Sequence, residues 1–302
     1  MLNLLLFGGS GFVGRNFIKK YHKNYKIFSC GRTAVSEKNV ENIYCNLKKK
    51  INFSKLPKKI DKIIYLAQEP EYVNFPSSSD SILNINFLRF YELLKHCADQ
   101  KISGIIYLSS GGIYGLSKKP VKESDWVKDY ENNWKFENSK LNFYFKTKIM
   151  SEIVANSYRN IMKICILRPF FIYGPGNREN ALFNKIIKRI SHSEPIILDS
   201  QEGIRISTIH IIDAVDAINH CIKKNLNDTF NLCGKETYTL KQISEMIAEL
   251  LGKKVKFRIK NKKKGTLCIA GNSSKIKSTG WNQNFNLMKG LKESLYNLNK
   301  NK

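Results

Sequence analysis

Three glycines near the start of the chain have the spacing of a phosphate-binding turn. Gly8, Gly11 and Gly14 are each separated by two residues. They follow the apolar stretch Leu2–Phe7 and open a segment with apolar residues at helical spacing. In such a turn the first glycine permits a tight bend, the second lets the backbone approach a pyrophosphate, and the third allows close helix–strand packing. Because backbone N–H groups at the helix start can then hold the anion, we interpret the segment as a dinucleotide-binding turn, with a plain structural turn as the alternative.

A second chemistry is indicated by tyrosines that have a lysine four residues on. Residues at this spacing share one face of a helix, so the ammonium can lower the pKa of the phenol and let it act as an acid or base near neutral pH. In a lysine-rich chain the pattern arises easily. Five tyrosines carry it: Tyr44, Tyr91, Tyr114, Tyr144 and Tyr296. The spacing alone does not choose among them.

The elements that must position these residues alternate along the first part of the chain. Short Ile-, Leu-, Tyr- and Phe-rich runs bounded by Gly, Asn or charge predict buried strands. They are Leu2–Phe7, Lys26–Cys30, Lys62–Ala67, Gly104–Ser109 and Ile164–Pro169. Helical spacing recurs between them, for example over Ile82–Leu93. Strand–helix alternation predicts an α/β fold, a Rossmann-type doubly wound parallel sheet.

After Pro169 the alternation loosens, which predicts a second, smaller part. We expect a dinucleotide-binding Rossmann domain over residues 1–169, rejoined by about 205–235, and a mainly substrate-binding C-terminal α/β domain over 170–302. A helix is predicted from the N-cap Thr239 to Gly252. Asp213 is expected to cap the helix that follows it.

The composition is strongly basic. With 51 Lys and Arg against 25 Asp and Glu, the formal net charge is +26, which indicates anionic partners such as nucleic acid, a membrane surface or phosphorylated small molecules. The seven cysteines include no C-x-x-C pair and no Cys/His cluster at metal-ligand spacing, so we expect reduced thiols, no metal site and a cytoplasmic location. No apolar run could span a membrane and the amino terminus lacks a basic leader, so we expect a soluble protein without membrane insertion.

Further motifs come after the glycine turn in order along nearly the whole chain. They are Ile63–Gln68 at the expected strand, the serine motif Leu108–Gly115, the strand-turn Leu167–Gly176 and the carboxy-terminal Asn272–Trp281. Together with the G-x-x-G-x-x-G spacing they resemble the extended short-chain dehydrogenase/reductase family, also called the NAD-dependent epimerase/dehydratase family, in its nucleotide-sugar modifying branch. The resemblance implies a nicotinamide-dependent oxidoreductase on a Rossmann fold.

The resemblance also implies a set of cofactor-binding residues. NAD-binding members usually end the second strand with an acidic residue; here Arg32 could instead pair with a 2′-phosphate, which favours NADP(H) and leaves NAD(H) as the alternative. Asn46 and Leu47 stand where the family commonly has Asp-Leu beside the adenine. The predicted cofactor-binding residues are Gly8, Gly11, Phe12, Gly14, Arg32, Asn46, Leu47, Ala67, Tyr144 and Lys148.

One tyrosine–lysine pair fits the family's order. The pair must begin a helix after the serine strand and before the next strand, a place that only Tyr144 and Lys148 occupy. Tyr144 would then meet the substrate oxygen, and Lys148 would lower the pKa of the phenol and hold the nicotinamide ribose. Ser110 would hydrogen-bond the same oxygen. The predicted catalytic residues are therefore Ser110, Tyr144 and Lys148, against the alternative of an exposed Tyr and Lys on an ordinary helix.

A nucleotide-diphosphate sugar is the substrate that the resemblance implies. In family members an arginine holds the diphosphate, and it is followed shortly by Ile-His or Ile-Tyr and then by an Asp. Arg205, His210 and Asp213 have this order here, although Arg205 lies one residue further from His210 than is usual. The predicted substrate-binding residues are Ser110, Tyr144 and Arg205, with an exposed strand-edge cation as the alternative for Arg205. We expect His210 to be structural.

The two residues after Ser110 are glycines, Gly111 and Gly112, and they limit which reactions of the family are possible. They stand where dehydratases of the family carry Asp-Glu, which disfavours 4,6-dehydration. Reduction of a 4-keto sugar and 4-epimerisation both need only hydride transfer with Ser, Tyr and Lys. Arg32 favours the reductase, and we expect such an enzyme to act in surface polysaccharide synthesis. The alternative is a 4-epimerase that holds NAD tightly. A non-catalytic dinucleotide-binding or nucleic-acid-binding protein is a more distant alternative; we expect no nucleic-acid partner, and the family resemblance implies a homodimer.

Overall fold

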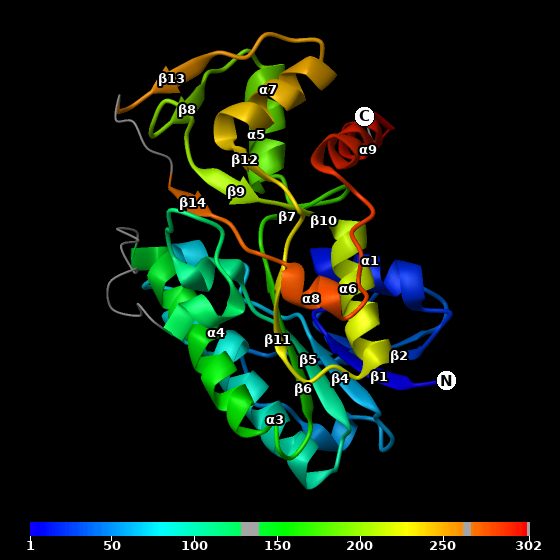
Figure 1. Ribbon diagram of the computed structural model, residues 1–302. Helices are drawn as coiled ribbons and strands as arrows, with labels where there is room; N and C mark the ends of the chain where they lie inside the picture. Colours follow the sequence, from blue (N-terminus) through cyan, green and yellow to red (C-terminus); the bar gives the residue numbers. More distant parts are fainter. Residues whose placement is uncertain (128–138, 262–266, 301–302) are drawn as a thin grey trace. The chain divides into compact units, whose positions relative to one another are not determined.

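A seven-stranded sheet forms the centre of the computed structural model, which describes residues 1–127, 139–261 and 267–300 (Figure 1). Its strand order is β11-β6-β5-β4-β1-β2-β3. The strands are β1 (Asn3–Phe7), β2 (Lys26–Gly31), β3 (Val40–Tyr44), β4 (Lys62–Tyr65), β5 (Gly104–Leu108), β6 (Lys163–Pro169) and β11 (Thr229–Leu232). Each neighbouring pair from β3 to β6 is parallel. The predicted doubly wound α/β fold is confirmed, since the order reverses at β1, where such folds place their ligand crevice.

Helices cover both faces of this sheet. On one face lie α3 (Arg89–Asp99) and α4 (Ser139–Ser157), and on the other lie α1 (Phe12–Tyr21) and α6 (Ile211–Lys224) (Figure 1). Buried side chains such as Phe7, Tyr65 and Phe90 pack the first face. The strands are apolar on both sides because neither face meets water, which explains their continuous rather than alternating apolar runs.

The helix predicted over Ile82–Leu93 is interrupted in the structure. The chain forms α2 (Ser79–Leu83), then a wide π turn over Asn84–Leu88, and then α3. Asn86, in the middle of the π turn, is fully buried. Such turns inside helices often re-aim a side chain at a functional site.

The chain divides into two compact units. The first comprises residues 1–113, 139–168 and 215–230, and the second comprises 114–127, 169–214, 231–261 and 267–300. The predicted boundaries of 1–169 and 170–302 stay a prediction about which part binds cofactor and which binds substrate.

The second unit has its own core and several small sheets. Its helices are α5 (Leu182–Ser191), α7 (Leu240–Leu250), α8 (Ser274–Ser278) and α9 (Leu287–Lys300). Its paired strands are β7 (Ile172–Tyr173) with β10 (Ile209–His210), β8 (Ile196–Leu198) with β13 (Phe257–Ile259), and β9 (Arg205–Ser207) with both β12 (Thr237–Thr239) and β14 (Cys268–Ile269). Thr239 caps α7 as predicted, because its hydroxyl accepts from the Gln242 N–H while the Gln242 side chain accepts from the Thr239 N–H.

One predicted cap is wrong. Asp213 lies inside the first turn of α6 rather than before it. Its carboxylate accepts hydrogen bonds from the backbone N–H groups of Asn284 (2.8 Å) and Phe285 (3.0 Å). The buried acid therefore satisfies the donors of a distant loop, a pairing that spacing along the chain does not indicate.

Candidate active site

The glycine turn joins β1 to α1 in the first unit, and its backbone leaves no room for side chains. Gly8 has a φ of +88°, and a Cβ there would lie 2.9 Å from the backbone nitrogen of Ala67, just beyond β4. A Cβ on Gly14 would lie 2.2 Å from the carbonyl oxygen of Gly8. Glycine is therefore required at both positions for the turn to pack against α1 and the end of β4.

The start of α1 suits a bound anion. The N-cap residue, Gly11, has no side chain that could cap the helix, and the first turn of α1 carries no acidic residue. Backbone N–H groups in a first helical turn have no partner within the helix and carry partial positive charge. Together with the Cβ-free turn, this fits the pyrophosphate of a dinucleotide.

Tyr144 and Lys148 lie one turn apart on α4, at the carboxyl end of the sheet strands. Tyr144 is 7% exposed, and its hydroxyl donates to the Gln68 side-chain oxygen at 2.8 Å. Lys148 is 1% exposed, and its Nζ donates to the Leu108 carbonyl at 2.9 Å, where β5 ends. The alternative of an exposed tyrosine and lysine on an ordinary helix is therefore wrong for this pair.

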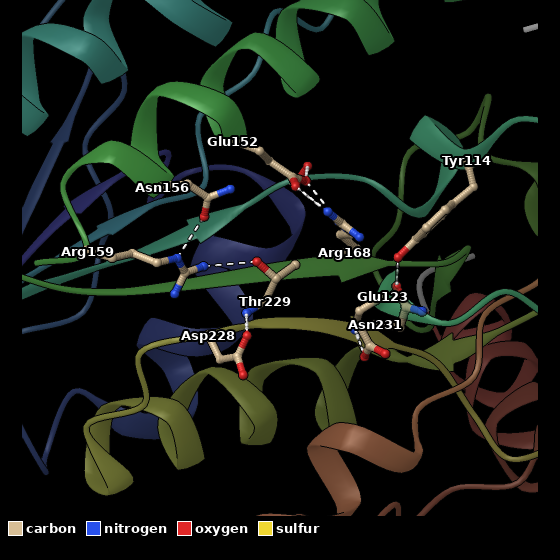
Figure 2. A network of polar contacts seen from close by, with 10 residues as sticks. Tyr114, Glu123, Glu152, Asn156, Arg159, Arg168, Asp228, Thr229 and Asn231 are labelled. Carbon is tan, nitrogen blue, oxygen red and sulfur yellow. Dashed lines mark hydrogen bonds and ion pairs between the residues drawn. The ribbon is translucent and has the colours of Figure 1, made fainter. Parts of the chain in front are cut away.

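Burial lowers the pKa of the Lys148 ammonium to about 7, against the opposing attraction of Glu152. Glu152 is itself buried and tied to Arg168, whose Nη2 lies 2.6 Å from its Oε2, as Figure 2 shows. Ser109 also donates to the same carboxylate. Because burial outweighs the attraction of Glu152, Lys148 lies near the point at which it can gain or lose a proton at neutral pH.

A buried hydrogen-bond chain holds this part of α4 in place. The Asn86 side chain accepts from the Glu69 N–H at 3.1 Å and donates to the Thr147 hydroxyl at 3.1 Å. Ser151 donates to the Asn86 carbonyl at 2.8 Å. The π turn that presents Asn86 thus links the end of β4 to the turn of helix between Tyr144 and Lys148.

Ser110 follows β5 and is half-buried. Its Oγ accepts from the Gly112 N–H at 3.1 Å, which leaves its hydroxyl proton available as a donor. A Cβ on Gly112 would lie 2.3 Å from the Phe145 ring. Phe145 is 8% exposed, so a longer side chain at position 112 would have to displace a packed aromatic.

The remaining predicted cofactor residues border the same edge of the sheet. Ala67 and Leu47 are buried, whereas Phe12 is half-buried and Arg32 is exposed beyond β2. The Asn46 side chain accepts from the Lys48 N–H at 3.1 Å, which closes a local turn. Their roles towards a cofactor stay predictions.

In the second unit, Arg205 begins β9 and is exposed. His210 is buried, and its ring stacks on Phe285 with centroids 4.0 Å apart. Burial, and secondarily Lys289, lower the pKa of His210 to about 4. These surroundings agree with a structural histidine, and the diphosphate role of Arg205 stays a prediction.

Gln68 is the neighbour of Tyr144 that the sequence reasoning missed. It lies three residues beyond the apolar strand β4, at the strand end where ligands bind in doubly wound folds, and that position is the signal in the sequence. Among the described residues no group of His, Cys, Asp and Glu could hold a metal ion. None of the described helices has the length and apolar character needed to cross a bilayer.

Comparison with known proteins decides the family. The family model described as NAD dependent epimerase/dehydratase family matches residues 4–233. The chain belongs to this family. The predicted membership of the extended short-chain dehydrogenase/reductase enzymes, in the nucleotide-sugar branch, is confirmed.

Curated proteins that act on nucleotide-linked sugars, by their names, resemble the chain over most of its length. The GDP-6-deoxy-D-talose 4-dehydrogenase of Aggregatibacter actinomycetemcomitans is 26% identical over 256 residues, covering 82% of this chain and 80% of the relative. The dTDP-4-dehydro-6-deoxy-D-allose reductase of a Streptomyces species is 21% identical over 277 residues, covering 85% and 83%.

Solved structures of nucleotide-sugar epimerases share the fold. The UDP-glucuronic acid 4-epimerase of Bacillus cereus, solved in complex with UDP-glucuronic acid and NAD, superposes with a TM-score of 0.83 at 19% identity, covering 100% of both chains. A UDP-N-acetylglucosamine 4-epimerase from Methanobrevibacter ruminantium superposes with a TM-score of 0.82 at 19% identity, covering 100% of this chain and 99% of the other.

Proposed function

We propose that the chain is an oxidoreductase that reduces the 4-keto group of a nucleotide-linked sugar, using a nicotinamide dinucleotide and Tyr144 as the acid. One observation carries the proposal: the Tyr144 hydroxyl is already a hydrogen-bond donor, and Lys148 is buried one turn further along α4. When bound, the nicotinamide supplies the hydride that the carbonyl carbon receives. Tyr144 then transfers its proton from Oη to the carbonyl oxygen.

Lys148 supports this proton transfer. Because burial lowers the pKa of Lys148 to about 7, its side chain can take up or release a proton near neutral pH. When protonated, it stabilises the phenolate that Tyr144 becomes after giving up its proton. An anionic ligand bound nearby would favour the ammonium form, so binding and proton transfer are coupled. Ser110, with its hydroxyl proton available, is the proposed second donor to the same substrate oxygen.

The surroundings of Gly112 support reduction over dehydration. A dehydratase of this family needs an acid–base pair after the serine, but here the two positions are Gly111 and Gly112. The Phe145 ring occupies the space that a side chain on Gly112 would enter. The chain therefore offers hydride and proton transfer without a second acid–base pair for water loss.

Arg32 supports the choice of NADPH. Its guanidinium is exposed immediately after β2, where the family recognises the adenosine ribose, and it suits a 2′-phosphate better than a free hydroxyl. The relevant test is the ratio of NADPH to NADH affinities in Arg32→Ala. The proposal expects this ratio to fall at least about tenfold, which corresponds to losing one charge-assisted contact. An unchanged ratio removes the NADPH preference.

Arg205 is proposed to hold the nucleotide diphosphate.

The reaction is tested by incubating the protein with NADPH or NADH and a panel of nucleotide-linked 4-keto sugars. Stoichiometric loss of the reduced-nicotinamide absorbance supports the reductase. Interconversion of 4-epimers without net consumption supports the 4-epimerase that the NAD-bound structural relatives suggest, and it overturns the proposed reduction.

Tyr144→Phe tests the acid. Turnover should fall by about 10²- to 10⁴-fold while cofactor binding is retained, since the ring stays and only the proton donor is lost. Tyr91→Phe is the matched control: Tyr91 also has a lysine four residues on, but it is 41% exposed on α3. Equal loss in both variants, or none in Tyr144→Phe, contradicts the assignment.

A further inference from the structure

Gln68 contacts the reacting hydroxyl without itself giving or taking the transferred proton. It lies three residues beyond β4 and is half-buried. Its Oε1 accepts the hydrogen bond from the Tyr144 Oη at 2.8 Å. The next residue, Glu69, is held through its N–H by Asn86, so the backbone on this side of Gln68 is tied to the same network as α4.

We propose that Gln68 is a positioning residue that directs the Tyr144 hydroxyl and holds the phenol in its protonated form until the substrate takes the proton. This deepens the proposed function and rests on it. A carbonyl oxygen can only accept, so this contact requires the phenol to keep its proton. Hydrogen bonding to the neutral form disfavours ionisation.

Gln68 acts on the state before proton transfer, when Tyr144 still holds its proton. In the reduction, hydride adds to the carbonyl carbon, the Tyr144 O–H bond breaks, and a new O–H bond forms on the sugar oxygen. The phenolate left behind needs a donor. Lys148, and not the accepting oxygen of Gln68, is the group that favours this phenolate.

Other groups around Tyr144 come from several elements. Lys148 lies one turn along α4, with its Nζ 5.9 Å from the centre of the Tyr144 ring. The centre of the Tyr72 ring lies 4.6 Å from the centre of the Tyr144 ring, and Tyr72 begins the short 3₁₀ turn Tyr72–Asn74. Tyr107, on β5, interacts electrostatically with Tyr144 and has a pKa raised by burial. Since Lys148 favours the phenolate and Gln68 favours the phenol, the two oppose each other at one oxygen.

The experiment is a titration of Tyr144 itself. Carbon-13 at the tyrosine ζ position reports ionisation by NMR, and the Tyr144 signal is the one missing from Tyr144→Phe. Gln68→Leu should lower the Tyr144 pKa by about half to one unit, because one acceptor to the neutral form is lost. Gln68→Glu should raise it by about one unit or more, because a carboxylate disfavours a neighbouring phenolate. Gln100→Leu, at the exposed end of α3, should leave it unchanged.

The pKa order Gln68→Glu above wild type above Gln68→Leu supports the proposal. Equal titrations in the three proteins, or shifts of the same sign in both variants, overturn it. Gln68→Glu keeps the shape of the side chain, so it carries the test if Gln68→Leu does not fold; an unchanged or lowered pKa in Gln68→Glu then overturns the proposal.

The two proposals fail separately. With an active substrate, the alkaline limb of the kcat profile, where Tyr144 loses the proton it must donate, should move in the same order as the NMR titration. If the NMR order holds but no 4-keto sugar is reduced, the positioning role of Gln68 stands and the proposed reaction falls. If a sugar is reduced but neither variant moves the titration, the role of Gln68 falls and the reaction stands.

Discussion

Lys148 in the first unit and His210 in the second are both nitrogen bases that burial makes harder to protonate. The pKa of Lys148 falls to about 7 and that of His210 to about 4. Lys148 donates to the carbonyl at the end of β5 and lies one turn from the Tyr144 hydroxyl on α4. His210 instead stacks on the Phe285 ring and meets the Tyr173 ring edge-on. A shifted pKa thus marks a candidate site only where reactive groups and a ligand cradle surround it.

One acid in each unit shows the same contrast between a candidate site and a structural role. Glu152 in the first unit is fully buried and bonded to Arg168 and Ser109. Glu123 in the second unit is half-buried and accepts from the backbone N–H of Asn231 at 2.7 Å (Figure 2). Glu152 pairs with the buried Arg168 and attracts Lys148. Glu123 instead accepts a hydrogen bond from the backbone of β11.

The largest expected effect separates these two acids. Glu152→Ala leaves Arg168 as a buried charge without its carboxylate, so the free energy of unfolding should fall by about 3–5 kcal/mol. Glu123→Ala removes an acceptor from a backbone N–H and should cost only about 1–3 kcal/mol. Urea unfolding of both variants measures the difference, and an equal loss would contradict the distinct roles of the two acids.

A smaller effect is expected at the glycine turn. In Gly14→Ala the new Cβ meets the Gly8 carbonyl, which is backbone and cannot move aside. We expect a loss of about 1–3 kcal/mol in unfolding free energy and at least about tenfold weaker dinucleotide binding.

Gly31→Ala is the matched control for the glycine turn, because its Cβ would meet nothing closer than the Thr33 carbonyl at 3.8 Å. Calorimetric titration with NADPH and NADH compares the two variants. Equal binding by both would show that the turn does not hold the cofactor.

The pH dependence of stability tests Lys148. Between about pH 7 and its ordinary pKa of 10.5, the unfolded chain holds a proton that native Lys148 has lost. This residue therefore makes the free energy of unfolding rise with pH in that window, by at most about 1.4 kcal/mol per unit, and contributes no slope well below pH 7. The stability gained by Lys148→Met over wild type should shrink as the pH rises from about 7 to 9 in thermal unfolding. A constant difference would place the pKa of Lys148 outside this range.

The smallest effect is expected for His210. With a pKa of about 4 it is neutral from about pH 6 upwards, and among the described contacts neither ring nitrogen makes a hydrogen bond. His210→Leu keeps an apolar filling against Phe285, so unfolding free energy should change by less than about 1 kcal/mol. The pH profile of turnover should not move; a shifted profile would make His210 part of the chemistry.

The fold class, the glycine turn and the family follow from the sequence alone. These features are local, since apolar runs, Gly14 and the Thr239 cap each act within a few residues of the chain. The order of motifs along the chain also singled out Tyr144 among five tyrosines with the same spacing.

The surroundings of those residues are set by contacts between distant parts of the chain. The partners Gln68 and Tyr144 are 76 positions apart, and Asn86 and Thr147 are 61 apart. The binding of Asp213 to the backbone of a loop 71 residues away replaced the predicted cap for the same reason. Burial and long-range hydrogen bonds set pKa values and side-chain directions, and both arise only when strands and helices that are distant in sequence pack together.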